Sequence, residues 1–334
     1  MWLINSSVGR KFIMALTGAC LVLFVTFHCL MNSVAILWPA AYNTICEILG
    51  ANWYALVASA GLGLLFVIHI IYAVMLTIQN RQARGNVRYE INRRPQGVEW
   101  SSKNMFVLGV VILAFLIVHL IQFWAKMQLA EIRGVEGAIP PAAGTLFISE
   151  AFSCIWTPIV YIIGFIALWF HMNHGFWSMF QSIGWDSTVW IPRLKKISCW
   201  WTSIVIALFI IQACVFTVKA RSGFYLSDSE LREQYKEMLA PMMEKEYGKE
   251  IVLFLEMTPY EQASMRLRSE YQSLKSQLES PMAKDQLKQD PQLAEKIEKR
   301  LRALECADAM FSYIEKNDPK KAEVNPMMMT QPVM

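Results

Sequence analysis

The five histidines of the chain are the residues whose type and placement indicate chemistry. They are His28, His69, His119, His171 and His174, and each lies in or beside a long apolar stretch. Burying an imidazole there is costly without a partner, so such a residue is by default a candidate functional residue. A single histidine would more often be a packed, hydrogen-bonded residue. Histidines in four successive stretches are harder to explain that way, and they indicate a shared function.

Helix geometry sorts four of these histidines into two levels. His28 and His119 lie 17 and 16 residues beyond the nearest preceding lysine, which is about 24 to 26 Å along an unbroken helix. His69 lies 12 residues before Arg81, or about 18 Å from the same basic end, and His171 also lies near that end. We therefore expect one pair from the first and third stretches and another from the second and fourth.

Two stacked histidine pairs suit two bis-histidine haems, because imidazole is an axial ligand of haem iron. Zinc is the alternative, but it usually takes at least three protein ligands. Gly18 and Gly109 precede the histidine of their own stretch by ten residues, near the inner pair, whereas Gly61, Gly63 and Gly164 lie nearer the outer pair. Each helix could offer a ligand at one level and room for a flat macrocycle at the other. Ordinary small-residue packing between membrane helices explains the glycines equally well.

Composition places these stretches in a membrane. The chain has 334 residues, of which 55% are hydrophobic, and it contains 12 Trp and 18 Phe. A bilayer crossing needs about 20 apolar residues, and five stretches are long enough: 12–38, 53–78, 105–128, 152–171 and 197–218. The first is too long for the apolar core of a signal peptide, which spans about 7–15 residues. The predicted fold is all-α, an integral membrane five-helix bundle with a soluble helical C-terminal extension.

The positive charges predict the orientation of this bundle. Eleven Lys and Arg residues fall before the first stretch, between the second and third, and before the fifth. The short loops at the opposite end hold only Lys126 and Arg133. By the positive-inside rule the N-terminus is cytoplasmic, and five crossings place the C-terminus outside.

The composition changes after residue 220, which predicts three parts. They are a transmembrane domain over 1–220, a helical extension on the outer (periplasmic) side over 221–325, and a disordered tail over 326–334. Residues 221–334 carry 20 acidic and 17 basic side chains, so we expect no sixth crossing there.

Helix signals recur within the extension. Thr258-Pro259-Tyr260-Glu261 has the pattern of a capping box, and Asp290-Pro291 is a second predicted helix start. Apolar residues then follow at helical spacing, namely Leu293, Ile297, Leu301, Leu304, Met310, Phe311 and Ile314. Three cysteines lie on or near the outer side, where a disulfide can form, but no spacing requires one: Cys46, Cys154 and Cys306.

Four parts of the sequence give the chain a resemblance to a known family. They are SSVGRKFIMALTG with FHCLMN over 6–32, FVIHIIYAVMLTIQNRQAR over 66–84, the VHL around His119, and FHMNHGFWSMFQSIGW over 170–185. With these parts the chain resembles the five-helix, two-haem cytochrome b subunit of succinate dehydrogenase/fumarate reductase, the membrane anchor of succinate:quinone oxidoreductase. The resemblance covers residues 1–220, and the ordered histidine pattern is its specific part.

The resemblance implies ligands, cofactors and partners. In that family the histidines of helices one and three bind the distal haem and those of two and four the proximal haem, which gives His28 with His119 and His69 with His171. A flavoprotein subunit carrying FAD and an iron–sulfur subunit dock on the cytoplasmic face. Two haem b groups then carry electrons to a quinone, usually menaquinone, near the distal haem. The complex lies in the bacterial cytoplasmic (inner) membrane; the direction of turnover and a dimer of complexes are left open.

Further residues are candidates for the quinone site and for the haem propionates. Glu47 and Asn43, before the second stretch, could supply the proton donor or acceptor that a quinone needs, although Glu47 could simply be solvated. The cations that could contact propionates are Arg81, Lys195 and Lys196 at the inner haem and Lys126 at the outer haem. Anchoring at the membrane interface is the more common use of such side chains.

The second histidine of WFHMNHGFW has several possible roles. His174 lies one turn beyond His171 and about 60° around the helix, so both cannot bind the same face of one iron. His174 is expected to be a hydrogen-bond partner or a propionate contact, with ligation in place of His171 as the remaining alternative. Three arginines could bind partner subunits or only set the topology: Arg84, Arg93 and Arg94.

Two other classes of function stay open. The histidines could form a proton relay in a membrane transporter or channel, although the two-level pairing and the scarcity of other polar residues in the stretches argue against it. A membrane zinc hydrolase is disfavoured because the sequence has no HExxH motif and no carboxylate within the stretches. No basic aromatic patch suits nucleic acid.

Overall fold

The computed structural model describes residues 6–84, 99–134, 137, 139–280 and 289–319. Within these residues all regular secondary structure is helical, as the sequence predicts. The helices form two compact units, here called the long-helix unit and the short-helix unit. Arg93 and Arg94, and the tail predicted over 326–334, lie outside the described residues.

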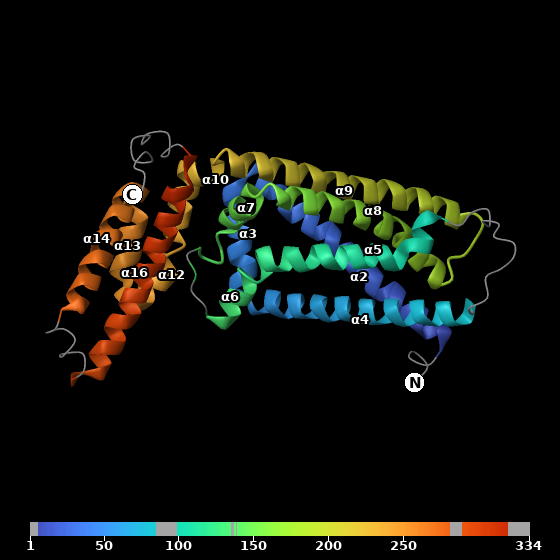
Figure 1. Ribbon diagram of the computed structural model, residues 1–334, viewed down its shortest axis with the longest axis horizontal. Helices are drawn as coiled ribbons and strands as arrows, with labels where there is room; N and C mark the ends of the chain where they lie inside the picture. Colours follow the sequence, from blue (N-terminus) through green and yellow to red (C-terminus); the bar gives the residue numbers. More distant parts are fainter. Residues whose placement is uncertain (1–5, 85–98, 135–136, 138, 281–288, 320–334) are drawn as a thin grey trace, which may run out of the picture. The chain divides into compact units, whose positions relative to one another are not determined.

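The long-helix unit contains the five predicted apolar helices, each long and apolar enough to cross a membrane. In Figure 1, α4, α5, α8 and α9 run along a common direction and α2 crosses them obliquely. Helix α5 packs along α8 and continues into a short π-helix, η1. The bounds are α2 Ser7–Leu37, α4 Trp53–Arg84, α5 Trp100–His119, η1 Leu120–Trp124, α8 Trp156–Ser182 and α9 Trp190–Arg221.

Large apolar side chains cover the outside of the long-helix unit. Leu23, Leu64 and Trp200 are 70%, 62% and 73% exposed. Soluble monomers rarely expose wide apolar patches. Such a surface is typical of helices that face lipid.

Two helices extend beyond the apolar stretches predicted from the sequence. Helix α8 continues to Ser182 instead of ending at His171, so His174 lies inside it. Helix α9 begins at Trp190, seven residues before the predicted start at 197, after a turn in which Gly184 has a φ of 99°. The prediction followed apolarity, whereas these ends are aromatic and polar segments that keep helical backbone hydrogen bonds.

The short-helix unit consists of the C-terminal extension together with two segments that connect long helices in the sequence, 37–51 and 122–154. Helix α14 packs along α16, and α12 contacts both α13 and α16 (Figure 1). The bounds are α3 Pro39–Ala51, α6 Gln128–Arg133, α7 Gly144–Ser153, α10 Phe224–Ser227, α11 Ser229–Glu237, α12 Ala240–Tyr247, α13 Lys249–Met257, α14 Tyr260–Glu279 and α16 Pro291–Asn317.

One face of α16 forms the core of the extension. Leu304, Met310, Phe311 and Ile314 are fully buried, whereas Leu293 is 42% exposed. The predicted apolar stripe is therefore confirmed in the second half of the helix and wrong at its first residue.

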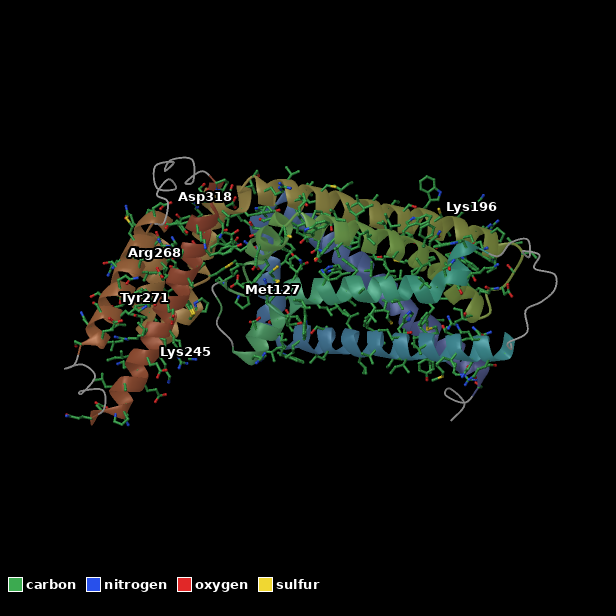
Figure 2. The ribbon with its side chains drawn as sticks, in the orientation of Figure 1. Met127, Lys196, Lys245, Arg268, Tyr271 and Asp318 are labelled. Carbon is green, nitrogen blue, oxygen red and sulfur yellow. The ribbon has the colours of Figure 1, made fainter. Side chains whose placement is uncertain are left out.

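Ion pairs join α14 to α16 beside this core. Arg268 of α14, labelled in Figure 2, contacts Glu315 of α16 at 2.5 Å and Asp308 at 3.4 Å. It also donates a hydrogen bond of 2.9 Å to Ser312. Both helices thereby keep their polar faces paired next to the apolar contact.

Both predicted helix starts are confirmed to within one residue, but only one of them has the predicted side-chain cap. Asp290 caps α16 by accepting hydrogen bonds from the backbone of Gln292 and Leu293. The capping box at Thr258 does not form, because Thr258 ends α13 and the N-cap of α14 is Pro259.

The first backbone N–H of α14 finds its acceptor on another helix. The amide of Tyr260 donates to Glu233 of α11 at 2.8 Å. Burial raises the pKa of Glu233, but the hydrogen bonds from Lys236 and Tyr260 outweigh it and hold the pKa below its usual value.

None of the seven cysteines forms a disulfide in the described structure, including the three on the side where the sequence left one open. Burial raises the pKa of the Cys46 thiol to about 12, against smaller opposing effects of hydrogen bonds to Tyr42 and Gly144. Cys46 is therefore a protonated packing residue at neutral pH.

Candidate functional site

The structure brings four histidines together as two pairs within the long-helix unit. His28 of α2 faces His119, the last residue of α5, with ring centroids 5.8 Å apart and an angle of 80° between planes. His69 of α4 faces His171 of α8, with centroids 6.4 Å apart and an angle of 62°. The pairs join helices one with three and two with four, as the depths along the sequence suggest.

Two glycines show that the pairs lie at different levels. A Cβ atom on Gly18 would lie 3.6 Å from Cε1 of His69, and one on Gly109 would lie 3.8 Å from Cε1 of His171. Each glycine precedes the outer-pair histidine of its own helix by ten residues, which is about 15 Å of helix. The pairs are therefore about 15 Å apart along α2 and α5.

The glycines expected at the outer level differ in their surroundings. A Cβ atom on Gly164 would lie 2.8 Å from Cδ2 of Phe115, and closer still to Cγ. Gly61 and Gly63 have open space around them, with no atom within 4 Å of an added Cβ. An added Cβ would thus be in ordinary contact with an inner ring at Gly18 or Gly109, and would clash with Phe115 at Gly164.

Aromatic rings surround the outer pair. Phe24 stacks on His28 at 5.5 Å, Phe115 stacks on His119 at 6.0 Å, and Tyr161 packs edge-on to His119 at 5.9 Å. The sequence interpretation missed these partners, although a signal was present. Phe24 and Phe115 each precede the histidine of their helix by four residues, so the pattern FxxxH occurs in both helices and places both side chains on one helix face.

Three ring nitrogens have a side-chain partner. Nδ1 of His69 lies 3.1 Å from Oγ1 of Thr17, and Nδ1 of His119 lies 3.1 Å from the hydroxyl of Tyr161. Nε2 of His28 lies 3.1 Å from Nδ2 of Asn32, which therefore donates to it. A metal-binding histidine commonly donates its second N–H to a partner that fixes the orientation of the ring; Thr17 and Tyr161 can accept such a bond, whereas Asn32 donates to His28.

The fourth ring differs from the other three. Nδ1 of His171 is buried and makes no well-formed hydrogen bond among the described residues, although the backbone of Met105 lies beside it. His171 is thus the ring whose orientation depends most on packing.

A π-helical turn follows the outer pair. Helix α5 ends at His119, and Leu120–Trp124 forms η1. Short π-helical segments are rare and occur frequently at functional sites. No sequence signal predicted this turn, because hydropathy is the same for α- and π-helical backbone.

His174 belongs to a separate cluster at the end of α8. Its Nδ1 lies 3.2 Å from Glu99, whose other carboxylate oxygen lies 2.8 Å from Nζ of Lys195. That ammonium stands 4.2 Å above the ring of Trp177. Partial burial raises the pKa of Glu99, but Lys195 and His174 outweigh it and hold the pKa below its usual value. Sequence reasoning missed Glu99, which stands just before the third apolar stretch.

The remaining inner-level cations show no common arrangement. The guanidinium of Arg81 lies 5.9 Å from the ring centroid of Phe106. Lys196, labelled in Figure 2, is exposed near the start of α9. Arg84 is the last residue of α4.

The outer-loop candidates lie in the short-helix unit. Asn43 is fully buried and hydrogen-bonded to Thr145 and Gln234, whereas Glu47 is exposed. Lys126 pairs with Glu150 at 2.7 Å. The structure thus gives Asn43 and Lys126 protein partners of their own.

The described residues contain no cluster of three or more His, Cys, Asp or Glu side chains that could hold a metal ion. The two histidine pairs are therefore the arrangement from which a site can be built. Comparisons of the chain with protein-family models, with curated proteins and with solved structures found no match.

Proposed function

We propose that the chain is the dihaem cytochrome b membrane anchor of a succinate:quinone oxidoreductase. The observation that carries this proposal is the pairing of four histidines from four helices, at two levels about 15 Å apart along the helices. The resemblance of the motifs within residues 6–185 supports the choice of family, and the geometry of the histidine pairs supports haem as the cofactor.

The spacing of the pairs fits one metal between two imidazoles. Two metal–nitrogen bonds of about 2 Å, together with half of each ring, set the ring centroids about 6 Å apart. The observed separations are 5.8 and 6.4 Å. Gly18 and Gly109, which lack a Cβ beside the inner rings, leave room there for a flat macrocycle. One contact must change, because Asn32 occupies Nε2 of His28 and would have to turn away.

Residues of the chain would bind the two haem groups, orient the histidine rings and shield those rings from water. His28, His119, His69 and His171 are the proposed ligands of two haem b groups, which when bound supply a path for single electrons. Thr17 and Tyr161 orient two of the rings through Nδ1. Phe24 and Phe115 cover the outer rings and exclude water from them.

The long-helix unit is proposed to lie in the bacterial cytoplasmic (inner) membrane. Five apolar helices with exposed Leu, Ile and Trp side chains support this placement. The basic residues near the starts of α2, α5 and α9 and near the end of α4 favour a cytoplasmic N-terminus and a periplasmic extension. The flavoprotein and iron–sulfur subunits would dock on the cytoplasmic face, and a quinone, with menaquinone as the expected type, would exchange electrons at this subunit.

A difference spectrum tests the proposal. The purified full chain, reduced with dithionite minus oxidised, should show a b-type α band and about two haems per chain. His28→Ala and His69→Ala should each remove about one haem, whereas His174→Ala should keep both because His174 pairs with Glu99. A folded protein without haem absorbance would overturn the proposal; a proton current across vesicles in that sample would favour the channel instead.

A further inference from the structure

One hydroxyl group of α2 lies within hydrogen-bonding distance of three partners. Oγ1 of the buried Thr17 is 2.9 Å from the carbonyl oxygen of Ile13, 3.2 Å from that of Met14, and 3.1 Å from Nδ1 of His69. The first two partners belong to the same helix, and His69 belongs to α4.

The number of protons decides the direction of these bonds. A hydroxyl has one proton and two lone pairs, and a carbonyl oxygen can only accept. If Thr17 donated to His69, its oxygen would face two carbonyl oxygens at 2.9 and 3.2 Å without a proton between them. If Thr17 donates to its own helix, the bond to α4 must be donated by the N–H of His69. The second arrangement alone satisfies all three groups.

We infer that Thr17 is a positioning residue that holds His69 in the tautomer with its proton on Nδ1. A neutral imidazole carries one N–H, so Nε2 of His69 then presents a lone pair. That this lone pair serves an inner haem rests on the proposed function; the tautomer itself does not. Gly18, next to Thr17, has only hydrogen where a Cβ would lie 3.6 Å from Cε1 of the same ring.

In the described part of the chain no threonine plays this part at the other three rings, and at His28 it is Asn32 that donates to Nε2. On α5 the residue before Gly109 is Leu108, which has no hydroxyl to offer His171. Tyr161 contacts His119, but a phenol can donate or accept, so this bond does not set the tautomer of His119. Thr17 therefore acts on one ring of the inner pair.

The chain provides matched variants for a test. Thr17→Val keeps the branched shape and removes the hydroxyl, and Thr17→Ser keeps the hydroxyl. Thr26 is the control, because its hydroxyl donates to Val22 of the same helix at 2.9 Å and contacts no histidine in the described structure. Thr26→Val thus removes the same kind of bond from α2, together with a hydrogen bond of 3.3 Å that Thr26 accepts from Trp201, and it leaves His69 untouched.

The first measurement needs no haem. The ¹⁵N-labelled full chain, prepared without haem in detergent micelles, is examined by long-range ¹H–¹⁵N correlation, and the His69 signals are assigned by their loss in His69→Ala. We expect the Nδ1–H tautomer in the unchanged chain, in Thr17→Ser and in Thr26→Val. Thr17→Val should show the other tautomer or a mixture. An Nε2–H tautomer in the unchanged chain, or no change in Thr17→Val, overturns the inference.

The second measurement uses the haem-loaded chain. A hydrogen bond from the second nitrogen makes a ligand more basic, and losing it typically weakens metal binding by about 10- to 100-fold. Thr17→Val should therefore weaken retention of the haem that His69→Ala removes, and raise its reduction potential, while the other haem keeps its potential. Thr17→Ser should restore both values. Equal effects on both haems, or none on either, overturn the inference.

The two measurements separate the two proposals. A tautomer change in a chain that binds no haem supports the role of Thr17 and refutes the cytochrome. Two haems that are indifferent to Thr17→Val support the cytochrome and refute the role of Thr17.

Discussion

Replacing Asn43 by leucine should loosen the first turn of α7, because this side chain holds three groups of the short-helix unit. Its amide nitrogen donates to Gln234 at 2.9 Å, and its oxygen accepts from the backbone N–H and the hydroxyl of Thr145, both at 2.9 Å. Asn43 and Thr145 are fully buried. In Asn43→Leu the amide of Thr145 is left without an acceptor and without access to water.

The size of the effect follows from that amide. Leaving a buried donor unsatisfied costs about 1–3 kcal/mol. Because each 1.4 kcal/mol is about tenfold in an equilibrium constant, amide exchange at the start of α7 should become about 5- to 140-fold faster. Asn43→Asp should also be destabilising, because it places a carboxylate oxygen where the amide of Asn43 donates to the oxygen of Gln234. The amide group of Gln234 cannot turn over to donate to this carboxylate without losing its bond of 3.0 Å to Ala40.

Hydrogen–deuterium exchange of the full chain, followed in peptides that cover α7, measures this directly. Glu47→Gln is the matched control on the same helix, because Glu47 is exposed, and its exchange should be unchanged. The reasoning also separates the two quinone candidates. If Asn43→Leu leaves exchange in α7 unaltered while quinone turnover falls, the structural role argued for Asn43 is wrong and the quinone role gains support.

Three further variants have clear expectations. Gly164→Ala should push Phe115 off His119 at an overpacking cost of about 1–3 kcal/mol, so haem titration should show loss of the same haem that His28→Ala removes, whereas Gly61→Ala, with open space around it, should keep both. Phe311→Ala should lower the free energy of unfolding of the extension by about 3–5 kcal/mol, measured by urea unfolding, against a change within about 0.5 kcal/mol for the exposed Leu293→Ala. Lys195 and His174 hold the pKa of Glu99 below its usual value. Their pairing with Glu99 therefore stabilises the start of α5 at any pH above the usual pKa, and this stabilisation is lost as the pH falls through the lowered pKa. Protection of the amides at the start of α5, taken relative to the intrinsic exchange rate at each pH, should therefore fall at acidic pH in the unchanged chain and be low at all pH values in Glu99→Gln; a pH-independent protection in the unchanged chain would contradict this.

Helix number, helix order and the pairing of histidines were predictable because they depend on one variable, the height along a helix. A rise of about 1.5 Å per residue converts sequence separation into depth without knowledge of packing. For this reason the sequence predicts that His28 pairs with His119 and that Gly18 lies at the level of the inner pair. The capping box at Thr258 does not form although its local pattern is sound, because the backbone N–H of Thr258 donates to Phe254 of the preceding helix and the first amide of α14, that of Tyr260, donates to Glu233.

The partners of the rings were not predictable, because they depend on how each helix is rotated. Thr17 and Leu108 occupy the same place relative to Gly18 and Gly109, and only the structure shows that Thr17 turns its hydroxyl to a histidine. In a membrane bundle this rotation is set by close packing of small residues and not by a polar outer face, so hydropathy does not report it. The repeated FxxxH pattern is the exception, since both residues of each pair lie on one helix and keep their relation under any rotation. Signals within a helix can therefore be searched for in sequence, whereas the hydroxyl that sets the tautomer of His69 required the arrangement of α2 against α4.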